Sequence, residues 1–170
     1  VDLGSGTLTA GHYSSSDGSY ALSGSGSLTA FREAIGHYGT GSLTQSGGTN
    51  AVTTSLLLGE ASTGSGTYTM TGGILQATDA GLFLSIGKQG SGTFTQSGGS
   101  VDLGSSGLDV GTDSGSNGTY TLSGTGSLSA RYEHIGKQGS GTFNQSGGTN
   151  TISDALTIQT YDGSSGTYDL

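Results

Sequence analysis

Residues 117–147 read NGTYTLSGTGSLSARYEHIGKQGSGTFNQSG and contain the pattern that decides the fold. The segment opens on Gly118-Thr-Tyr-Thr-Leu122, and the same kind of phrase, Gly141-Thr-Phe-Asn-Gln145, returns 23 residues later. Between the two phrases lie two more runs of alternating small polar and larger residues, separated by glycine-bearing corners. Alternation with a period of two is typical of β-strands, and three short strands that return at a regular interval indicate a repeating coil.

The strand-opening motif, glycine followed by Ser or Thr and then by Tyr, Phe or Leu, recurs along the whole chain. Successive starts lie 23, 25, 26, 26, 23 and 25 residues apart, and the first four intervals together span 100 residues. A shift of 100 positions aligns residues 1–70 with 101–170 without a gap, and 34 of the 70 pairs are identical. A register kept this strictly predicts a folded repeat rather than a disordered tract. The starts are Ser19, Ser42, Thr67, Thr93, Thr119, Thr142 and Thr167.

The composition fits a thin core and excludes several classes of protein. Gly, Ser and Thr supply 90 of the 170 residues, whereas Leu, Ile, Val and Phe number only 31, too few for a round globular core. A net charge of −8 with four Lys and Arg argues against a nucleic-acid partner, and no apolar run is long enough for a membrane helix. The absence of cysteine excludes disulfides and thiol chemistry. We therefore predict one all-β domain over residues 1–170, a parallel β-solenoid of about seven coils of 23–26 residues with three short strands per coil.

Strand alternation predicts which side chains point into the solenoid. The first inward position is aromatic or Leu in every coil, the second is aliphatic or Gln, and the third strand supplies an aliphatic ladder. We expect each buried Gln to bind unpaired backbone groups of the Ser-Gly-Gly corner that follows it, and we expect positive φ at the Gly after most third strands. The predicted core ladders are Tyr20, Leu43, Tyr68, Phe94, Tyr120, Phe143 and Tyr168; Leu22, Gln45, Met70, Gln96, Leu122, Gln145 and Leu170; and Ile35, Leu58, Ile86, Val110, Ile135 and Ile158.

An enzymatic site would need functional groups that gather in space. Carboxylates on an outer face are typical of carbohydrate-active β-helices, and the candidates here are Asp79, Asp102, Asp109 and Asp113. We interpret them as solvated surface charges, because Thr and Tyr replace two of them one hundred residues earlier. The three histidines are interpreted as exposed residues in different phases of the repeat, which argues against a metal site. We predict no catalytic residue, no cofactor and no metal; the histidines are His12, His37 and His134.

The outward Ser and Thr rows are the candidate for a binding surface. Three consecutive Thr-x-Thr pairs follow one another, and such flat arrays resemble those of ice-binding β-solenoids. The alternative explanation is that Thr suits exposed strand positions on any sheet. The rows are interrupted at Ala21, Asn144 and Asp169. The predicted face consists of Thr67 and Thr69, Thr93 and Thr95, and Thr119 and Thr121.

The two ends of the chain carry no polar cap, so we expect contacts between copies. Residues 167–170 form a first strand, whereas residues 1–18 supply second and third strands, and together they match the length of one short coil. Unpaired strand edges template pairing with another chain, and head-to-tail contacts that do not close produce filaments. We expect head-to-tail stacking, either of separate subunits or within one longer chain. The candidate contact residues are Val1, Asp2, Leu3, Tyr168, Asp169 and Leu170.

The repeats resemble those of a group of large bacterial surface proteins. Gly141-Thr-Phe-Asn-Gln-Ser-Gly-Gly-Thr149, Gly118-Thr-Tyr-Thr-Leu-Ser-Gly124 and Glu133-His-Ile-Gly136 are similar to the repeats of autotransporter-like and PEP-CTERM-associated β-strand repeat proteins. The similarity covers nearly the whole chain. It implies a right-handed parallel β-helix that is secreted or displayed on a bacterial cell surface.

Together, repeat and resemblance predict a structural, non-enzymatic extracellular fibre or surface-adhesin stalk whose main partner is another copy of itself. The alternative is a binding module that uses the outward Ser and Thr face for ice, glycans or a host surface. A carbohydrate-active enzyme is a more distant alternative.

Overall fold

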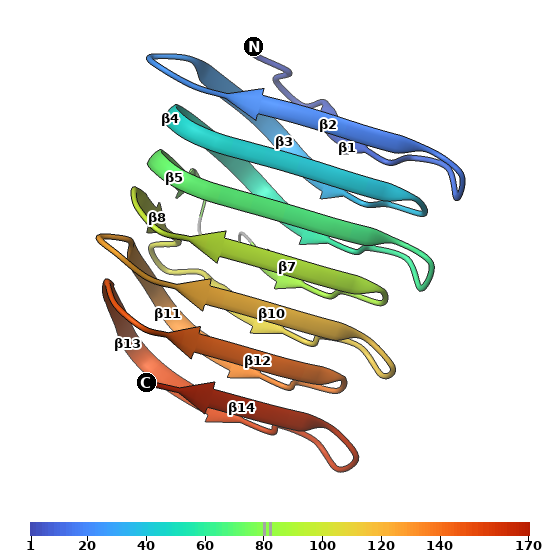
Figure 1. Cartoon of the computed structure of the whole chain (residues 1–170), viewed down its shortest axis with the longest axis vertical. Coiled ribbons are helices and arrows are strands. Elements are labelled where there is room, and N and C mark those ends of the chain that lie inside the picture. The colour runs from blue at the N-terminus through green and yellow to red at the C-terminus, as the bar shows by residue number, and fades with distance from the viewer. Residues whose placement is uncertain (80, 82) are drawn as a thin grey trace.

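The structure is a computed structural model that describes residues 1–79, Gly81 and 83–170, and every regular element in these ranges is a β-strand (Figure 1). The strands pair in parallel and stack along one axis, with the N-terminus at one end and the C-terminus at the other. In Figure 1 the near strands run from right to left and the strands behind them return as the chain descends, so the coil is right-handed. The predicted right-handed parallel β-solenoid is confirmed, with about six turns rather than seven.

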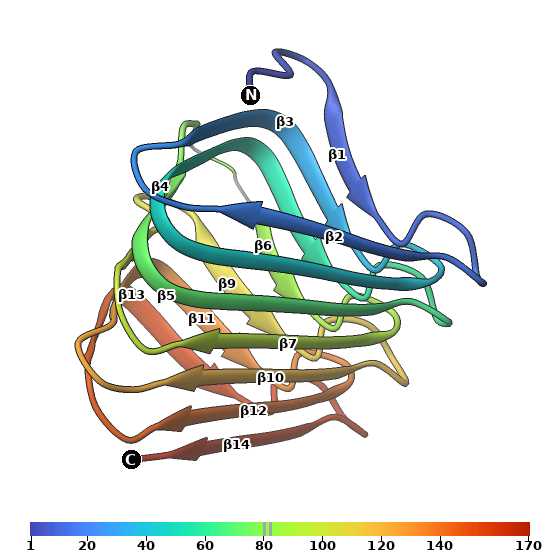
Figure 2. The same cartoon turned by 45° about the horizontal axis from the view of Figure 1, so that its top comes forward.

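Each coil has three sides, which are visible together in Figure 2. The first face holds β2 (Asp17–Leu22), the start of β4 (Thr40–Leu58), the start of β5 (Ser65–Ala77), β7 (Ser91–Gln96), β10 (Asn117–Leu122), β12 (Ser140–Gln145) and β14 (Ser165–Asp169). The second and third faces hold β1 (Thr7–Ala10), β3 (Ser27–Ile35), β6 (Phe83–Ile86), β8 (Ser100–Asp102), β9 (Gly107–Val110), β11 (Ser127–Ile135) and β13 (Thr149–Ile158), with the later parts of β4 and β5.

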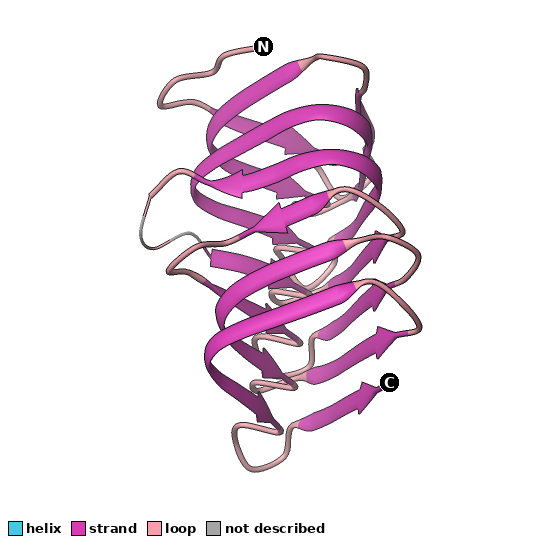
Figure 3. Ribbon diagram, turned by 90° about the vertical axis from the view of Figure 1, so that its left-hand side faces the viewer, coloured by secondary structure: helices cyan, strands magenta, loops and turns pink. Residues whose placement is uncertain are grey.

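The prediction of three separate strands per coil is wrong for most coils. Strands β3, β11 and β13 each run through the second and third faces, and Figure 3 shows them curving without a loop between. The register shifts between Ala30 and Arg32, and between Ala130 and Tyr132. A local irregularity of this kind bends a strand while most of its ladder stays paired. The chain breaks at this bend between β5 and β6 and between β8 and β9, whereas β4 runs through all three faces.

The core contains a column of five aromatic rings on the inner side of the first face. Tyr68, Phe94, Tyr120, Phe143 and Tyr168 stack with centroids 4.6–4.9 Å apart and interplanar angles of 6–10°. This spacing matches the ~4.8 Å between paired strands, so the backbone ladder itself sets the distance between the rings. Buried aliphatic ladders of the other faces fill the rest of the coil.

The predicted core ladders are buried except towards the two ends. Tyr20, Gln145 and Tyr168 are half-buried, because each belongs to a coil near one end. Two expectations are wrong: Ile158 is 44% exposed and Leu170 is 92% exposed. Ile158 keeps its inward register against Ile135, so its exposure results from the absence of a further coil over it.

The glycine of the strand-opening motif is the second residue of every first-face strand, and the sequence analysis did not predict why glycine is needed there. A Cβ built on Gly66 would lie 2.0 Å from the carbonyl oxygen of Ile35. The strand start and the end of the third face therefore meet backbone to backbone, and only glycine fits between them. The predicted positive φ after the third strand is present, for example +73° at Gly36. In the last coil Gln159 occupies this position with a φ of +59°, the one non-glycine positive φ among the described residues.

Candidate binding surfaces

The predicted threonine face exists as two straight ranks on the first face. Thr67, Thr93 and Thr119 pair in register across β5, β7 and β10, and the second Thr of each strand pairs in the same way. Neighbouring ranks follow the spacings of a parallel sheet, about 4.8 Å across strands and about 6.6 Å along them. The side chains are exposed or half-buried, and the expected interruptions fall at the neighbouring ladder positions Ala21, Asn144 and Asp169.

A row of mostly polar and aromatic side chains follows the residue that ends each third strand, a glycine in every coil except the last, where it is Gln159. We call this the corner row; its members are His12-Tyr13, His37-Tyr38, Glu60-Ala61, Lys88-Gln89, Thr112-Asp113, Lys137-Gln138 and Thr160-Tyr161. The corner backbone continues the coil-to-coil hydrogen bonding: the Ala61 amide donates to the His37 carbonyl at 2.9 Å, and the Asp113 amide donates to that of Lys88 at 3.0 Å. The side chains of the row are therefore held in a ladder of their own.

Side chains of the corner row pair with charged residues of the third face. Asp109, on β9, is fully buried and accepts hydrogen bonds from Lys137 Nζ at 2.6 Å and from His134 Nδ1 at 2.7 Å. Glu60 forms ion pairs with Arg32 and, at 3.0 Å, with His37. These ion pairs connect successive coils, and the sequence analysis did not predict them.

The carboxylates considered for an enzymatic site do not share one set of partners. Asp102, on β8, binds the Gly104 amide and the Ser129 hydroxyl at 3.0 Å each. Asp113 pairs with Lys88 at 2.6 Å, and Asp79 is exposed. The expectation of surface charge is wrong for Asp109, which is fully buried and bonded to Lys137 of the corner row and His134 of β11.

The histidine interpretation needs a correction. His12 and His37 each follow the glycine that ends a third strand, so they share one phase of the repeat, and their ring centroids lie 5.3 Å apart. Both belong to the corner row rather than to exposed strand positions, and His134 lies half-buried on β11. Among the described residues no group of three His, Cys, Asp or Glu side chains is placed to hold a metal ion.

The buried glutamines bind the groups that we expected and one more. Gln45 Nε2 donates to the carbonyls of Ile74 at 2.9 Å and Gly48 at 3.3 Å, both at a corner. Its Oε1 accepts a hydrogen bond of 2.6 Å from the Tyr68 hydroxyl. The same arrangement recurs at Gln96 with Tyr120. Each glutamine thus ties a ring of the aromatic column to the corner of its own coil.

A buried glutamate completes this network in one coil of each hundred-residue repeat. Asn50 Nδ2 donates to Glu33 Oε2 at 3.1 Å and to the Tyr68 hydroxyl at 3.2 Å. Glu33 Oε1 and Asn50 Oδ1 are buried without hydrogen-bond partners. Burial raises the pKa of Glu33 to about 7, although the bond from Asn50 acts in the opposite direction.

The second copy of this network is built from Glu133, Asn150, Tyr168 and Gln145. Burial raises the pKa of Glu133 to about 7 as well. Strand alternation could have revealed both glutamates, because each stands two residues before an inward isoleucine.

The expected end-to-end residues lie at the two ends of the rod. Val1 to Leu3 run beside β3, with the terminal amine 2.6 Å from the Ser27 carbonyl and the Leu3 amide 2.9 Å from that of Thr29. At the other end Asp169 and Leu170 are exposed and Tyr168 is half-buried.

No helix in the described part of the chain is long and apolar enough to cross a membrane. No protein-family model matches the chain, and comparisons with curated proteins and with solved structures find no significant match.

Proposed function

We propose that the chain is a structural, non-enzymatic segment of an extracellular fibre or of the stalk of a bacterial surface adhesin. The main support for the proposal is that the strand pairing is continuous along the rod. The seven first-face strands pair in one register from β2 to β14. Hydrogen bonds of the corners and the column of rings continue along the same axis. Resemblance to bacterial surface repeats supports the extracellular location.

Head-to-tail stacking of copies is part of this proposal. The last coil leaves apolar side chains open along the axis, with Leu156 43% and Leu170 92% exposed. A second copy stacked on this end in the same register would place Val1 to Leu3 and β1 along β13 and β2 along β14, and it would cover these side chains and pair the free edges. Contacts of this heterologous kind extend into filaments.

Electron microscopy and sedimentation of the purified chain over a wide concentration range test this proposal. We expect filaments of constant width, and we expect the L156K/L170K variant to stay monomeric because two buried charges oppose the joint. Phe31→Lys is the matched control, since Phe31 is also 43% exposed but lies on the side of the rod. A wild-type chain that remains monomeric at every concentration would contradict stacking.

A second candidate function is binding of an ordered surface such as ice through the threonine face. Its specific support is the register that places Thr67, Thr93 and Thr119 in one straight rank. Inhibition of ice recrystallisation by the wild type, and its loss in Thr95→Lys with no loss in Asp102→Lys on another face, would support this function. No inhibition by the wild type would exclude it.

A further inference from the structure

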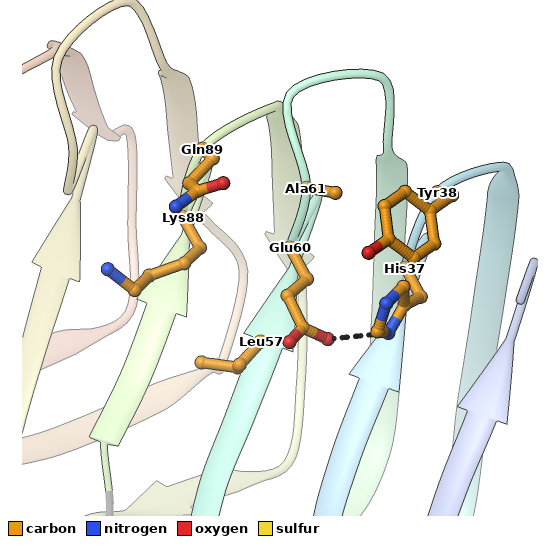
Figure 4. Close-up of a pocket in the computed structure, with 7 residues that line it drawn as sticks. All are labelled: His37, Tyr38, Leu57, Glu60, Ala61, Lys88 and Gln89. Carbon is orange, nitrogen blue, oxygen red and sulfur yellow. Dashed lines mark ion pairs between the residues drawn. The ribbon is translucent and has the colours of Figure 1, made fainter. Parts of the chain in front are cut away.

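The corner row contains a cleft that the threonine face and the fibre ends do not involve. The cleft has a volume of about 230 Å³ and is drawn in Figure 4. Its lining comes from three successive coils and includes Tyr38, Leu57, Glu60, Ala61, Lys88 and Gln89. Leu57 comes from the outer side of the third face, whereas the other five residues belong to the corner row.

The cleft exists because one member of the corner row is small. The Ala61 amide bonds to the His37 carbonyl, and the Gln89 amide bonds to that of Gly59, so the corners that carry Tyr38, Ala61 and Gln89 follow one another along the axis. A methyl group between two long side chains leaves one rung of the row open. The corners that carry Tyr38 and Gln89, the two walls of the opening, are two coils apart, which corresponds to about 9.6 Å along the axis.

This separation admits a layer one ring thick. Atoms in van der Waals contact lie about 3.5–4.0 Å apart, so contact with both walls uses roughly 7–8 Å of the gap. The remainder holds a single flat or puckered six-membered ring, and it excludes a helix or a pair of stacked rings. Tyr38 is 49% exposed, and its hydroxyl lies on the side of the ring that is nearer to Glu60 and Ala61 (Figure 4).

The chemistry of the lining selects a neutral, hydroxyl-rich ligand. Glu60 supplies carboxylate acceptors, the Gln89 amide both donates and accepts, and the Tyr38 hydroxyl does the same. The charges of the site are already balanced: Glu60 pairs with Arg32 and His37, and Lys88 pairs with Asp113 at 2.6 Å. An ionic ligand would have to break one of these pairs, whereas a neutral one would not.

We propose that this cleft binds a single neutral pyranose ring of a glycan. The C–H face of the sugar packs on the Tyr38 ring, and its hydroxyls bond to Glu60 and Gln89. Aromatic walls with a few convergent polar groups are the usual composition of small-ligand sites. The ion pairs from Arg32 and His37 hold the Glu60 carboxylate in place, so little ordering is needed on binding.

The other hundred-residue repeat carries different residues at two positions of the cleft. There the counterparts of Tyr38 and Ala61 are Gln138 and Tyr161, so the aromatic wall is lost and the open rung is filled. Tyr161 is 53% exposed and belongs to the last coil of the chain. The variants A61Y and Y38Q each copy one of these residues into the first repeat.

The test is titration of the 170-residue chain with neutral oligosaccharides, namely hexamers of β-1,4-glucose, α-1,4-glucose, β-1,3-glucose and β-1,4-xylose, with polygalacturonate as the anionic probe. Isothermal calorimetry and NMR shifts measure binding. We expect at least one neutral hexamer to bind and to shift resonances of Tyr38 and Gln89. Affinity should fall at least tenfold in A61Y and in Y38Q, while Y161A binds as the wild type does.

Thermal unfolding shows whether each variant remains folded, and Y38Q provides a second test if A61Y does not. Absence of binding by every neutral hexamer would overturn the proposal. Undiminished binding by folded A61Y and Y38Q, or binding of polygalacturonate alone, would overturn it as well. The proposal does not depend on filament formation, because the cleft lies on the side of the rod and is complete within one copy.

Discussion

Residues 1–70 and 101–170 form two versions of the same structure, and they differ most in the corner row. The buried Glu–Asn–Tyr–Gln network is present in both, with donor–acceptor distances of 2.6–3.4 Å. At the corner, His37, Tyr38, Glu60 and Ala61 give way to Lys137, Gln138, Thr160 and Tyr161. The interior is constrained by the neighbouring coils above and below, whereas the corner side chains can change without disturbing the stack.

Substitution of the glycine at the strand start should destabilise the interior of the stack more than its end, and this is the largest effect that we expect. In Gly66→Ala the new methyl would lie 2.0 Å from a backbone oxygen with coils on both sides, so we expect a loss of about 4 kcal/mol or more in the free energy of unfolding. Gly166→Ala makes a similar contact in the last coil, which can move away, and should cost clearly less. Urea unfolding measures both, with exposed Ser65→Ala as the control. Equal losses would contradict the role of confinement between coils.

The buried glutamates predict a stability that falls as the pH rises. Below pH 4.5 both folded and unfolded chains hold the proton, and between about 4.5 and 7 only the folded chain retains it. Unfolding then releases a proton, so stability declines across this interval by about 3 kcal/mol for each glutamate and levels off above pH 7.

Glu33→Gln removes this dependence for one network and supplies a donor for the unpaired Asn50 Oδ1. We expect the variant to be more stable than the wild type at pH 8 and the double variant E33Q/E133Q to be nearly independent of pH in this interval. Denaturant unfolding at several pH values provides the measurement. A wild-type stability that increases from pH 4.5 to 7 would show that the glutamates are ionised in the folded chain.

Removal of the tyrosine hydroxyl from each of the two Glu–Asn–Tyr–Gln networks should cost different amounts of stability. Tyr68→Phe leaves Gln45 Oε1 buried without its donor, and we expect a cost of about 2 kcal/mol. The half-buried Tyr168 should lose less than about 1 kcal/mol on the same change, since water can replace the hydroxyl. Chemical denaturation distinguishes the two, and equal losses would mean that burial does not set the cost.

The smallest expected effect concerns the corner that lacks glycine. Gln159 has a φ of +59°, a region that costs most residues about 1 kcal/mol, so Gln159→Gly should stabilise the chain by up to about 1 kcal/mol. One coil earlier, a Cβ on Gly136 would lie 2.1 Å from Ser165 O of the coil that follows. If a second copy stacked in the same geometry, its backbone would clash with the Cβ of Gln159 in the same manner. Gln159→Gly removes this clash, so it should also lower the concentration at which filaments form. A thermal melt and sedimentation check the two effects.

The fold could be predicted because alternation and period follow directly from how coils stack. Tyr120 and Leu122 point inward in any register that keeps Gly at the strand start. The positions of the corner glycines follow from the same repeat length. The bend at Ala30 could not be predicted, because a strand that curves through an irregularity keeps its polar and apolar alternation on both sides. The burial of Asp109 could not be predicted either, since its partners His134 and Lys137 lie 25 and 28 residues further along the chain, in the next coil.

The hydrogen-bond ladder between coils also determines how the rod responds to force. Its bonds lie nearly parallel to the long axis, so tension applied at the two ends loads the ladder of one coil at a time and peels it away. A coil of 25 residues contributes about 4.8 Å to the rod, yet it spans at most roughly 80–90 Å when drawn straight. A chain built in this way would lengthen in regular steps under tension, and each step would dissipate work before any covalent link is strained.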